Sequence, residues 1–364
     1  MQQTVLRRGW TTGTCATAAA KAAYAALLTG TFPDPVEVTL PRGERVAFAL
    51  AESRLGDGSA SAGIVKDAGD DPDVTHGALV RATVAPAPAG TGLLFRAGPG
   101  VGTVTRPGLP LPPGEPAINP VPRAMIAAAL AEVSASPVDL VVEISIPGGE
   151  ALALRTLNGR LGIVGGLSIL GTTGIVVPYS CAAWIDSIHR GIDVARAVGC
   201  THVAGATGNT SERAVQALHG LPEVALIEMG DFVGGMLKYL RAHPVARVSI
   251  AGGVAKMTKL AQGRLDLHSR RGEADLGALA QMAREAGAAE DAAVQVAGAN
   301  TVAEAFAVAG VALGDAVAER AWQVAADMLR PTPIELEVVV FDRAGALLGR
   351  RPFHANSPGR KRRR

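Results

Sequence analysis

The chain has 364 residues, of which 48% are apolar and 19% are charged, and its formal net charge is +2. This length and composition predict two domains that bury substantial cores. The small net charge, with no basic stripe interleaved with aromatic residues, argues against a nucleic-acid partner. Three widely spaced cysteines argue against a disulfide framework or a structural zinc site.

The ends of the chain and a long uncharged stretch bear on its location. The first ten residues, MQQTVLRRGW, lack the apolar segment of a signal peptide, so we expect a cytoplasmic protein. Residues 161–185 carry no charge and could span a bilayer, but their glycines and Pro178 break a regular helix. We therefore predict buried strands and loops there, and no membrane partner. Residues 355–364, with the basic end GRKRRR, are expected to form a disordered, solvated tail.

Residues 9–28, GWTTGTCATAAAKAAYAALL, change directly from threonines and glycines into an alanine-rich helix pattern. Thr11, Thr12 and Thr14 are candidate N-caps, and the alanines favour a helix. The exposed N–H groups and the dipole of such a helix start attract anions, which makes this segment a candidate floor for an anionic ligand. The alternative is a capped helix in a tightly packed core, and these residues taken alone favour it.

The first half of the chain mixes helices with short strands. Strands are predicted at PVEVTL, RVAFALA, GALVRATVAPAP and DLVVEISIP, and a helix at AMIAAALAEVSA. Before that helix, residues 98–123 are rich in Gly and Pro, and loops of this length are usually functional or disordered. The mixture predicts an α+β domain over residues 1–190.

The second half alternates strands and helices. Strands are predicted at THVAGATG, EVALIEMGD, ARVSIAGGV and IELEVVVF, separated by helical segments that include two alanine-rich ones before the last strand. Such alternation predicts a parallel sheet, whose ligands bind beyond the carboxyl ends of the strands. We therefore predict an α/β domain with a small parallel sheet over residues 191–354.

A glycine turn follows the first of these strands, in GATGNTSE. Its glycines let a ligand approach the backbone closely, and an acid about 20 residues further on commonly binds ribose hydroxyls. The candidate cofactor-binding residues are Gly205, Thr207, Gly208, Asn209, Glu228 and Asp231. The pattern is not a full G-x-G-x-x-G, so an ordinary strand-to-helix turn remains the alternative.

The segment VKDAGDDPDVTHG, residues 65–77, gathers four aspartates, a lysine and a histidine in one loop. Such a cluster suits metal binding or acid–base chemistry, although it lacks the spacing and terminal Glu of a calcium loop. Asp67 and His76 are the candidate catalytic residues. A solvated acidic loop is the alternative.

The segment 252–275 is rich in basic residues, which are suitable donors to the carboxylates of a polyacidic ligand. Lys256, Arg264 and Arg270 are the candidate substrate-binding residues in it. A charged helix face followed by a loop is the alternative.

These segments together resemble the cobalt-precorrin-5B C(1)-methyltransferase family of anaerobic cobalamin biosynthesis. The matching stretches follow one another in the expected order from residue 7 to about residue 270. They are GWTTGTCATAAAKAA, VKDAGDDPDVTHG, GPGVGTVTRPGLPLPPGEPAINPVPR, GRLGIVGGLSILGTTGIV, HVAGATGNTSE, EMGDFVGGML and AGGVAKMTKLAQGRLDLHS. The basic tail after Phe353 is not part of the resemblance.

The resemblance implies that the methyl group of S-adenosylmethionine passes to C-1 of cobalt-precorrin-5B, a tetrapyrrole, to give cobalt-precorrin-6A. It implies a first domain like a permuted ribosomal protein S5 domain 2 and a second domain with a small parallel sheet. The substrate brings its own cobalt, so no protein-bound metal is expected, and Thr11, Thr12 and Thr14 become candidate substrate-binding residues beneath the ring. The sequence leaves a homo-oligomer open.

Two other classes of function stay open at this point. Gly- and Thr-rich helix starts also cradle phosphates, as in kinase-like nucleotide-dependent transferases, but no G-x-x-x-x-G-K-[ST] pattern is present. The other class is a tetrapyrrole carrier without catalytic activity.

Overall fold

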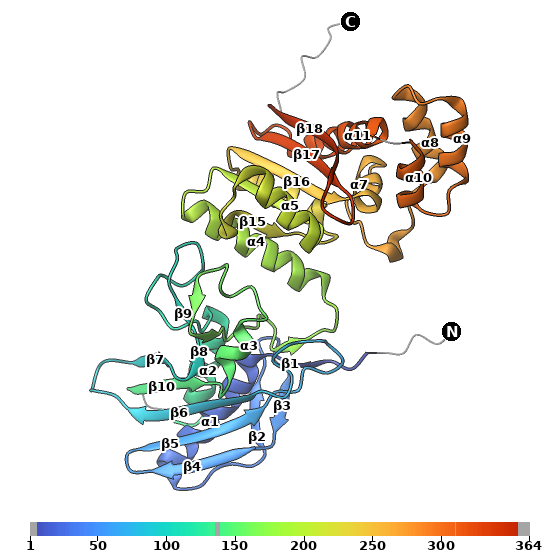
Figure 1. Cartoon of the computed structure of the whole chain (residues 1–364). Helices are drawn as coiled ribbons and strands as arrows, with labels where there is room; N and C mark the ends of the chain where they lie inside the picture. Colours follow the sequence, from blue (N-terminus) through green and yellow to red (C-terminus); the bar gives the residue numbers. More distant parts are fainter. Residues whose placement is uncertain (1–5, 135–138, 310, 356–364) are drawn as a thin grey trace, which may run out of the picture. The chain divides into compact units, whose positions relative to one another are not determined.

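The computed structural model describes residues 6–134, 139–309 and 311–355, and the chain divides into two compact units, residues 1–180 and 181–364. Both units contain helices and strands (Figure 1), so the chain is a mixed α/β protein. The sequence-based boundary after residue 190 lies within α4 (Cys181–Ala197). The basic tail expected at the end of the chain lies outside the described residues from position 356 onward.

The first unit is built on a five-stranded sheet with the order β4-β5-β6-β10-β7, in which only β10 and β7 are parallel neighbours. These strands are β4 (Glu52–Gly56), β5 (Ser59–Val65), β6 (Leu79–Pro86), β7 (Leu93–Ala97) and β10 (Leu140–Ser145). Short pairs complete it: β1 (Gly9–Trp10) with β13 (Ile175–Val176), β2 (Val36–Thr39) with β3 (Arg45–Phe48), β8 (Gly100–Val101) with β12 (Gly166–Leu167), and β9 (Thr103–Val104) with β11 (Ile163–Val164). Its helices are α1 (Thr12–Thr29), α2 (Pro120–Ala131) and α3 (Gly149–Ala153).

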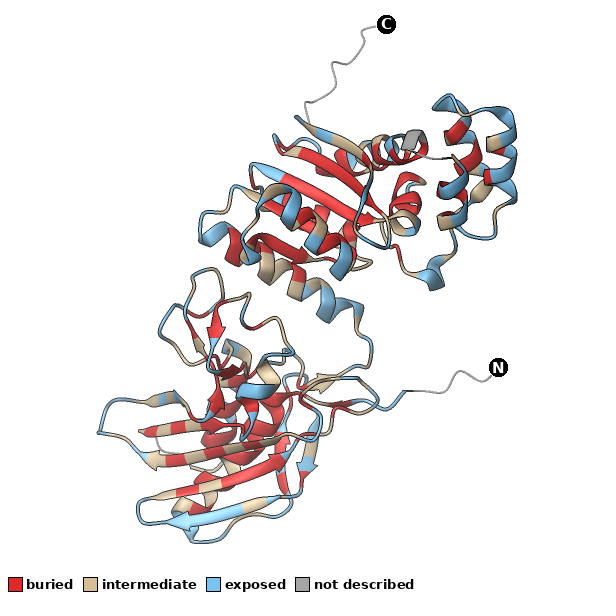
Figure 2. Cartoon of the chain, viewed as in Figure 1, coloured by how far each residue is buried: buried red, intermediate tan, exposed pale blue. Residues whose placement is uncertain are grey.

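Helix α1 is the centre of this unit. It packs against β5, β6 and α2, and Figure 2 shows it buried along most of its length. The alternating small and branched residues of the two strands, such as Ala62 opposite Ala82, form the surface beneath it. Alanine suits such a helix because it favours helical backbone and lets neighbouring elements approach closely.

The second unit is built on a sheet with the order β15-β14-β16-β17-β18. The first four are mutually parallel and β18 is antiparallel to β17. The strands are β14 (His202–Ala206), β15 (Leu226–Glu228), β16 (Arg247–Gly253), β17 (Glu335–Phe341) and β18 (Leu347–Ala355). The helices after α4 are α5 (Asn209–His219), η1 (Glu223–Ala225), α6 (Val233–Ala242), α7 (Val254–Ala261), η2 (Ser269–Arg271), α8 (Leu276–Glu285), α9 (Glu290–Gly298), α10 (Val302–Ala309) and α11 (Val311–Leu329).

Alternating residues of the parallel strands belong to two separate cores. Val203 and Ile250 contribute to the larger core with α4, α6, α7 and α11, whereas Ala204 and Ala251 contribute to a smaller core with α5. Near-continuous apolar strands are typical of parallel sheets that are covered on both faces. This sheet therefore has helices on both sides, with its carboxyl edge left to the loops.

The predicted parallel sheet is confirmed, and the helical part that precedes β17 differs from the prediction. Four helices, α8 to α11, replace the two expected alanine-rich segments. Gly287 has a φ of +87° just after α8, and α9 ends at Gly298, so glycines interrupt the apolar pattern. The uncharged stretch 161–185 forms three two-residue strands, loops and the start of α4. In the described ranges no helix is both long and apolar enough to cross a membrane.

A polar cluster lies near the amino ends of the parallel strands, away from their carboxyl edge. Glu337 on β17 is fully buried. It accepts hydrogen bonds from Ser249 Oγ (2.6 Å) and Arg350 Nε (2.7 Å), and His219 Nε2 lies 2.6 Å from its Oε2. His202 Nε2 lies 2.9 Å from Ser249 Oγ. The buried carboxylate is thus paired with a guanidinium, as a buried charge requires.

We expect the stability of the chain to depend on pH through His202. Burial, and secondarily the nearby His219, lowers the pKa of His202 from 6.5 to about 4. The unfolded chain therefore takes up a proton at higher pH than the folded chain, so this stabilisation is complete above pH 6.5 and is lost as the pH falls towards 4. The loss is on the order of 1–2 kcal/mol after allowance for partial exposure. Thermal melting between pH 7.5 and 4.5 should show a shallower decline for His202→Gln and an unchanged one for the exposed His354→Gln.

Candidate functional site

The strand order of the second unit creates a topological switch point between β14 and β16. From β14 the chain passes through α5 to β15 on one side, and later places β16 on the other side. In open parallel sheets, ligands bind at such a point, outside the carboxyl ends of the strands. Thr207 and Gly208 follow β14, and Gly252 and Gly253 end β16, so these residues form the floor of the candidate cofactor site.

At this edge of the sheet, close packing requires some of the glycines, whereas others have open space around them. A Cβ at Gly205 would lie 2.3 Å from Met236 Sδ, and one at Gly252 would lie 2.5 Å from Met257 Sδ, so packing explains both. Gly208 has an extended φ of 167°, Gly253 has a φ of −73°, and a Cβ at either would meet no atom within 4 Å. Neither backbone conformation nor packing requires glycine at positions 208 and 253, which is what a surface approached by a ligand would show.

Lys256, in the first turns of α7, ties the loops of this edge together. Its Nζ donates to Thr207 O at 2.8 Å and lies 3.0 Å from Asp231 Oδ1. The lysine predicted to bind the substrate is thus engaged by two residues predicted to bind the cofactor. The Glu228 carboxylate has no hydrogen-bond or ion-pair partner among the described residues, so it is the freer of the two candidate ribose ligands. Asn209, the first residue of α5, is exposed at the same edge of the sheet.

The loop after α7, residues 262–275, is called the basic loop here, and it reaches the same edge of the sheet. Leu267 N–H donates to Asp231 O and Gly234 N–H donates to Leu265 O, both at 2.9 Å, so the loop lies along the start of α6. Arg264 Nη1 donates to a backbone carbonyl, that of Arg271, at 3.3 Å. The Arg270 guanidinium is exposed and has no partner in the part of the chain that the structure describes.

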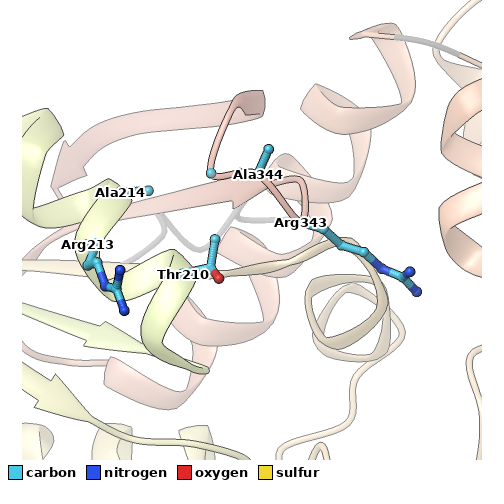
Figure 3. Close-up of a pocket in the computed structure, with 6 residues that line it drawn as sticks. Thr210, Arg213, Ala214, Arg343 and Ala344 are labelled. Atoms are coloured by element: carbon cyan, nitrogen blue, oxygen red, sulfur yellow. The ribbon is translucent and has the colours of Figure 1, made fainter.

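A pocket of about 370 Å³ lies between the first turns of α5 and the turn that joins β17 to β18. Thr210, Arg213, Ala214, Arg343, Ala344 and Gly345 line it. Figure 3 shows the guanidinium groups of Arg213 and Arg343 pointing in different directions. The pocket therefore lacks converging charges, and we place the candidate cofactor site at the switch point instead.

In the first unit, the acidic loop 66–77 is held by a buried lysine. Lys66 is 1% exposed, and its Nζ lies 2.7 Å from Asp73 Oδ2. Asp73 Oδ1 accepts from Thr75 N–H at 2.7 Å. Burial opposes ionisation of Asp73, but the hydrogen bonds from Lys66 and Thr75 outweigh it and lower the pKa of this carboxyl. This ion pair has a structural role beneath the more exposed residues of the loop.

The two candidate catalytic residues lie side by side on this loop. Asp67 makes a two-point ion pair with Arg7 and accepts from Gly69 N–H at 2.9 Å. These bonds lower the pKa of Asp67 to about 2. His76 Nδ1 accepts from Ala68 N–H at 3.1 Å and lies 3.8 Å from Asp67 Oδ1. A neutral His76 in this arrangement carries its proton on Nε2, because Nδ1 is the acceptor of Ala68 N–H.

The three threonines at the start of α1 are buried and bind a neighbouring loop. Thr11 Oγ1 caps Thr14 N–H at 3.2 Å, and Thr14 Oγ1 donates to Gly174 O at 2.7 Å. Thr12 Oγ1 accepts from Leu170 N–H at 3.0 Å, and Leu170 O accepts from Gly13 N–H, also at 3.0 Å. The loop 170–174 thus satisfies the helix start from within the protein.

The structure brings two groups of motifs together, each within one unit. In the first unit, Trp10 N–H donates to Asp67 O at 2.7 Å, and a Cβ at Gly9 would lie 2.1 Å from Ala68 C. The helix start, the acidic loop and the loop 170–174 therefore form one assembly. In the second unit, the glycine turn, the acid after β15 and the basic loop meet at the carboxyl edge of the sheet. In the described ranges, no three His, Cys, Asp or Glu residues are placed to hold a metal ion.

Two family models match the chain, CbiD over residues 1–178 and the CbiD C-terminal domain over residues 266–352. The chain belongs to the CbiD family. It is 65% identical to the cobalt-precorrin-5B C(1)-methyltransferase of Agrobacterium fabrum over 359 residues, which cover 97% of this chain and 96% of that relative. It is 62% identical to the protein of the same name from Halorhodospira halophila, with 95% of each chain covered. A crystal structure of the cobalamin biosynthesis protein CbiD from Archaeoglobus fulgidus is 29% identical, covering 73% of this chain and 83% of that chain with a TM-score of 0.39.

The two CbiD family models cover the first unit and the end of the second, but not the candidate cofactor site between them. The first model ends near the boundary of the first unit, and the second begins at residue 266, within the basic loop. The switch point, with β14, β15 and β16, lies between the two matched ranges, while the alignments to full-length CbiD relatives include nearly the whole chain.

One residue of this edge was not among the sequence-based candidates. Trp184, in the first turn of α4, is 44% exposed and donates from Nε1 to Glu228 O at 3.1 Å. It continues the apolar i, i+4 stripe of Ile188 and Ile192, so the sequence pattern suggests a core residue. Only the short length of β15 leaves it at the edge of the sheet.

Proposed function

We propose that this chain transfers a methyl group from S-adenosylmethionine to C-1 of cobalt-precorrin-5B, in the biosynthesis of cobalamin. The observation that carries the proposal is the 65% identity over 97% of the chain to a relative of that name. Methyl transfer between bound reactants depends mainly on positioning and on a fitted electrostatic setting, which two sites on rigid elements can supply.

We assign the cofactor to the switch point of the second unit. S-adenosylmethionine supplies an electrophilic methyl group when it is bound. The residues fit such a molecule, because Gly208 and Gly253 lack side chains where neither packing nor backbone requires it. Glu228 offers a carboxylate that no described residue pairs with, so it is available for ribose hydroxyls. Gly205, Thr207, Asn209 and Asp231 complete the edge. Lys256 then acts by fixing Thr207 and Asp231.

We assign the carboxylates of the tetrapyrrole to the basic loop. Arg270, whose guanidinium pairs with no described residue, is the main donor, and Arg264 belongs to the same loop. Lys256 belongs to the same segment, but its two contacts favour a role on the cofactor side. Thr11, Thr12 and Thr14 contribute to the substrate side indirectly: the Thr12 and Thr14 hydroxyls hold the loop 170–174 in place, and the Thr11 hydroxyl caps Thr14 N–H.

We assign the proton acceptor to His76 and its positioning to Asp67. A carboxylate with a pKa of about 2 is a weak base, whereas a neutral imidazole accepts a proton readily. A turn of the ring that exchanges Ala68 N–H for Asp67 Oδ1 would hold a proton on Nδ1 and free Nε2 to accept one.

The finer structural expectations belong to the same proposal. The first unit, residues 1–190 in the sequence-based division, would be a permuted relative of ribosomal protein S5 domain 2, and the second would extend over residues 191–354. The protein would act in the cytoplasm on a small-molecule tetrapyrrole, as a monomer or a homo-oligomer.

Incubation of the purified protein with methyl-labelled S-adenosylmethionine and cobalt-precorrin-5B tests the proposal. We expect label at C-1 of the tetrapyrrole, identified by carbon-13 NMR and mass spectrometry. Binding of both molecules without transfer would make the chain a carrier, and failure to bind S-adenosylmethionine would remove the assignment of the cofactor.

Gly208→Val should weaken binding of S-adenosylmethionine by about tenfold or more, because the new side chain occupies the floor of the site. The variant should fold, since a Cβ at this position meets nothing within 4 Å. Gly298→Val, at the end of α9 and equally free of contacts, is the matched control. Calorimetric titration measures both, and unchanged affinity in a folded Gly208→Val protein would contradict the placement.

Arg270→Ala should raise the KM for the tetrapyrrole several-fold while leaving the affinity for S-adenosylmethionine unchanged. Lys256→Ala should instead lower the affinity for S-adenosylmethionine, because Thr207 and Asp231 lose the side chain that holds them in place. The effect of Arg270 should shrink at high salt, as expected for a screened ionic contact. If the two variants affect both ligands alike, the division of roles between them is wrong.

A further inference from the structure

Trp184 is a large apolar side chain held at the carboxyl end of β15. Its indole N–H donates to the backbone oxygen of Glu228 at 3.1 Å, which fixes the ring in one orientation. A Cβ at Gly230 would lie 3.3 Å from the ring, so this glycine lets the backbone turn close beneath it. The Phe232 ring is tilted against it with the centroids 6.4 Å apart.

The exposure of this ring sets it apart from the other apolar residues on the same face of α4. Ile188 and Ile192, on the same face of α4, are at most 2% exposed, whereas Trp184 is 44% exposed. The stripe leaves the core at Trp184 because β15 ends at Glu228. The result is an oriented aromatic surface beside the carboxylate that we assign to the ribose.

We propose that Trp184 stacks against the purine ring of the bound cofactor and is its main affinity determinant on the adenine side. The inference rests on the proposed function, which places an adenosyl group at this edge. In a nucleoside the base is attached directly to the ribose, so a base whose ribose is bound at Glu228 lies near the next surface along the edge. The indole suits this role for two reasons. Aromatic stacking tolerates any purine face. The hydrogen bond to Glu228 O already orients the ring, so binding the base costs little further entropy.

The stacking makes the affinity depend on the aromatic character of position 184. Trp184→Ala should weaken S-adenosylmethionine binding about tenfold or more, Trp184→Phe should retain most of it, and Trp184→Leu should resemble alanine although it fills more space. The loss should recur with adenosine as the probe, because adenosine carries the purine and ribose alone. Melting temperatures of the three variants check their folding.

Tryptophan fluorescence provides a second measurement: quenching in the unmodified protein reports the contact, and two variants assign it to Trp184. Adenosine and S-adenosylmethionine should quench tryptophan emission, L-methionine should not, and Trp184→Phe should abolish the quenching. Trp10→Phe, which changes a tryptophan of the first unit, should keep it.

The outcomes separate this proposal from the proposed function. Tight binding of S-adenosylmethionine by a folded Trp184→Ala protein, together with weakened binding by Glu228→Gln, would overturn the stacking and leave the cofactor assignment intact. Failure of the unmodified protein to bind S-adenosylmethionine would overturn both.

Discussion

Replacing Asp73 with alanine should lower the free energy of unfolding by about 3–5 kcal/mol, the usual cost of leaving a buried charge without its partner. The Lys66 side chain is 1% exposed, and Asp73 is the ion-pair partner of its ammonium at 2.7 Å. Removal of the carboxylate leaves that charge in the interior and also removes the acceptor of Thr75. Chemical denaturation with urea measures the loss, and m-values show whether the transition remains cooperative.

A second change should restore part of this stability. In the double variant Lys66→Met/Asp73→Ala the orphaned charge is gone, so we expect it to be more stable than Asp73→Ala alone. Asp57→Ala, in the exposed turn between β4 and β5, is the control for loss of an aspartate. A double variant less stable than Asp73→Ala would show that Lys66 contributes mainly through contacts other than this ion pair.

Replacing His76 with glutamine should lower kcat by about 100-fold or more while both ligands still bind. The Gln amide oxygen can replace Nδ1 as the acceptor of Ala68 N–H, so the loop should stay folded, but the amide does not take up a proton. Single-turnover methyl transfer measures the rate of the chemical step, and the melting temperature shows whether the variant remains folded.

The variant Asp67→Asn shows whether Asp67 positions His76 for proton transfer or only stabilises the loop. If Asp67 positions His76, its loss should reduce kcat by a smaller factor and leave KM largely unchanged. If the ion pair with Arg7 mainly fastens the loop, the melting temperature and both affinities should fall together. Near-normal turnover in both His76→Gln and Asp67→Asn would exclude these residues from the proton transfer.

The parallel part of the second unit's sheet was predictable because each of its four parallel strands is a largely apolar run that ends in, or is closely followed by, glycine or an acid. Among the strands that were not predicted, two regions were missed for different reasons. The hairpin of β4 and β5 has small and polar residues instead of an apolar alternation, so its local signal is Asp57-Gly58 at the turn, where Gly58 has a φ of +72°. Strand β18 is an edge strand whose exposed residues, such as Pro352 and His354, hide the pattern.

The segments that form the candidate site could be predicted from the sequence, but the contacts between them could not. The glycine turn and Glu228 could be found because spacing after a strand has a physical meaning in parallel sheets. The partner of Lys256 could not be found, because its nearest acceptors come from two other loops. Trp184 was missed because its helical spacing is that of a core residue, and only the end of β15 exposes it.

The closure of the α1 start by the loop 170–174 has a consequence for the order in which the first unit is completed on the ribosome. Gly13 N–H and the Thr14 hydroxyl find their acceptors at Leu170 and Gly174, near the far end of the same unit. Until that segment has been synthesised, the amino end of the central helix lacks both its protein acceptors and the loop that covers it. A nascent chain or a truncated gene product that stops before residue 174 therefore carries an unfinished core, and the shortest N-terminal fragment able to fold must include the loop.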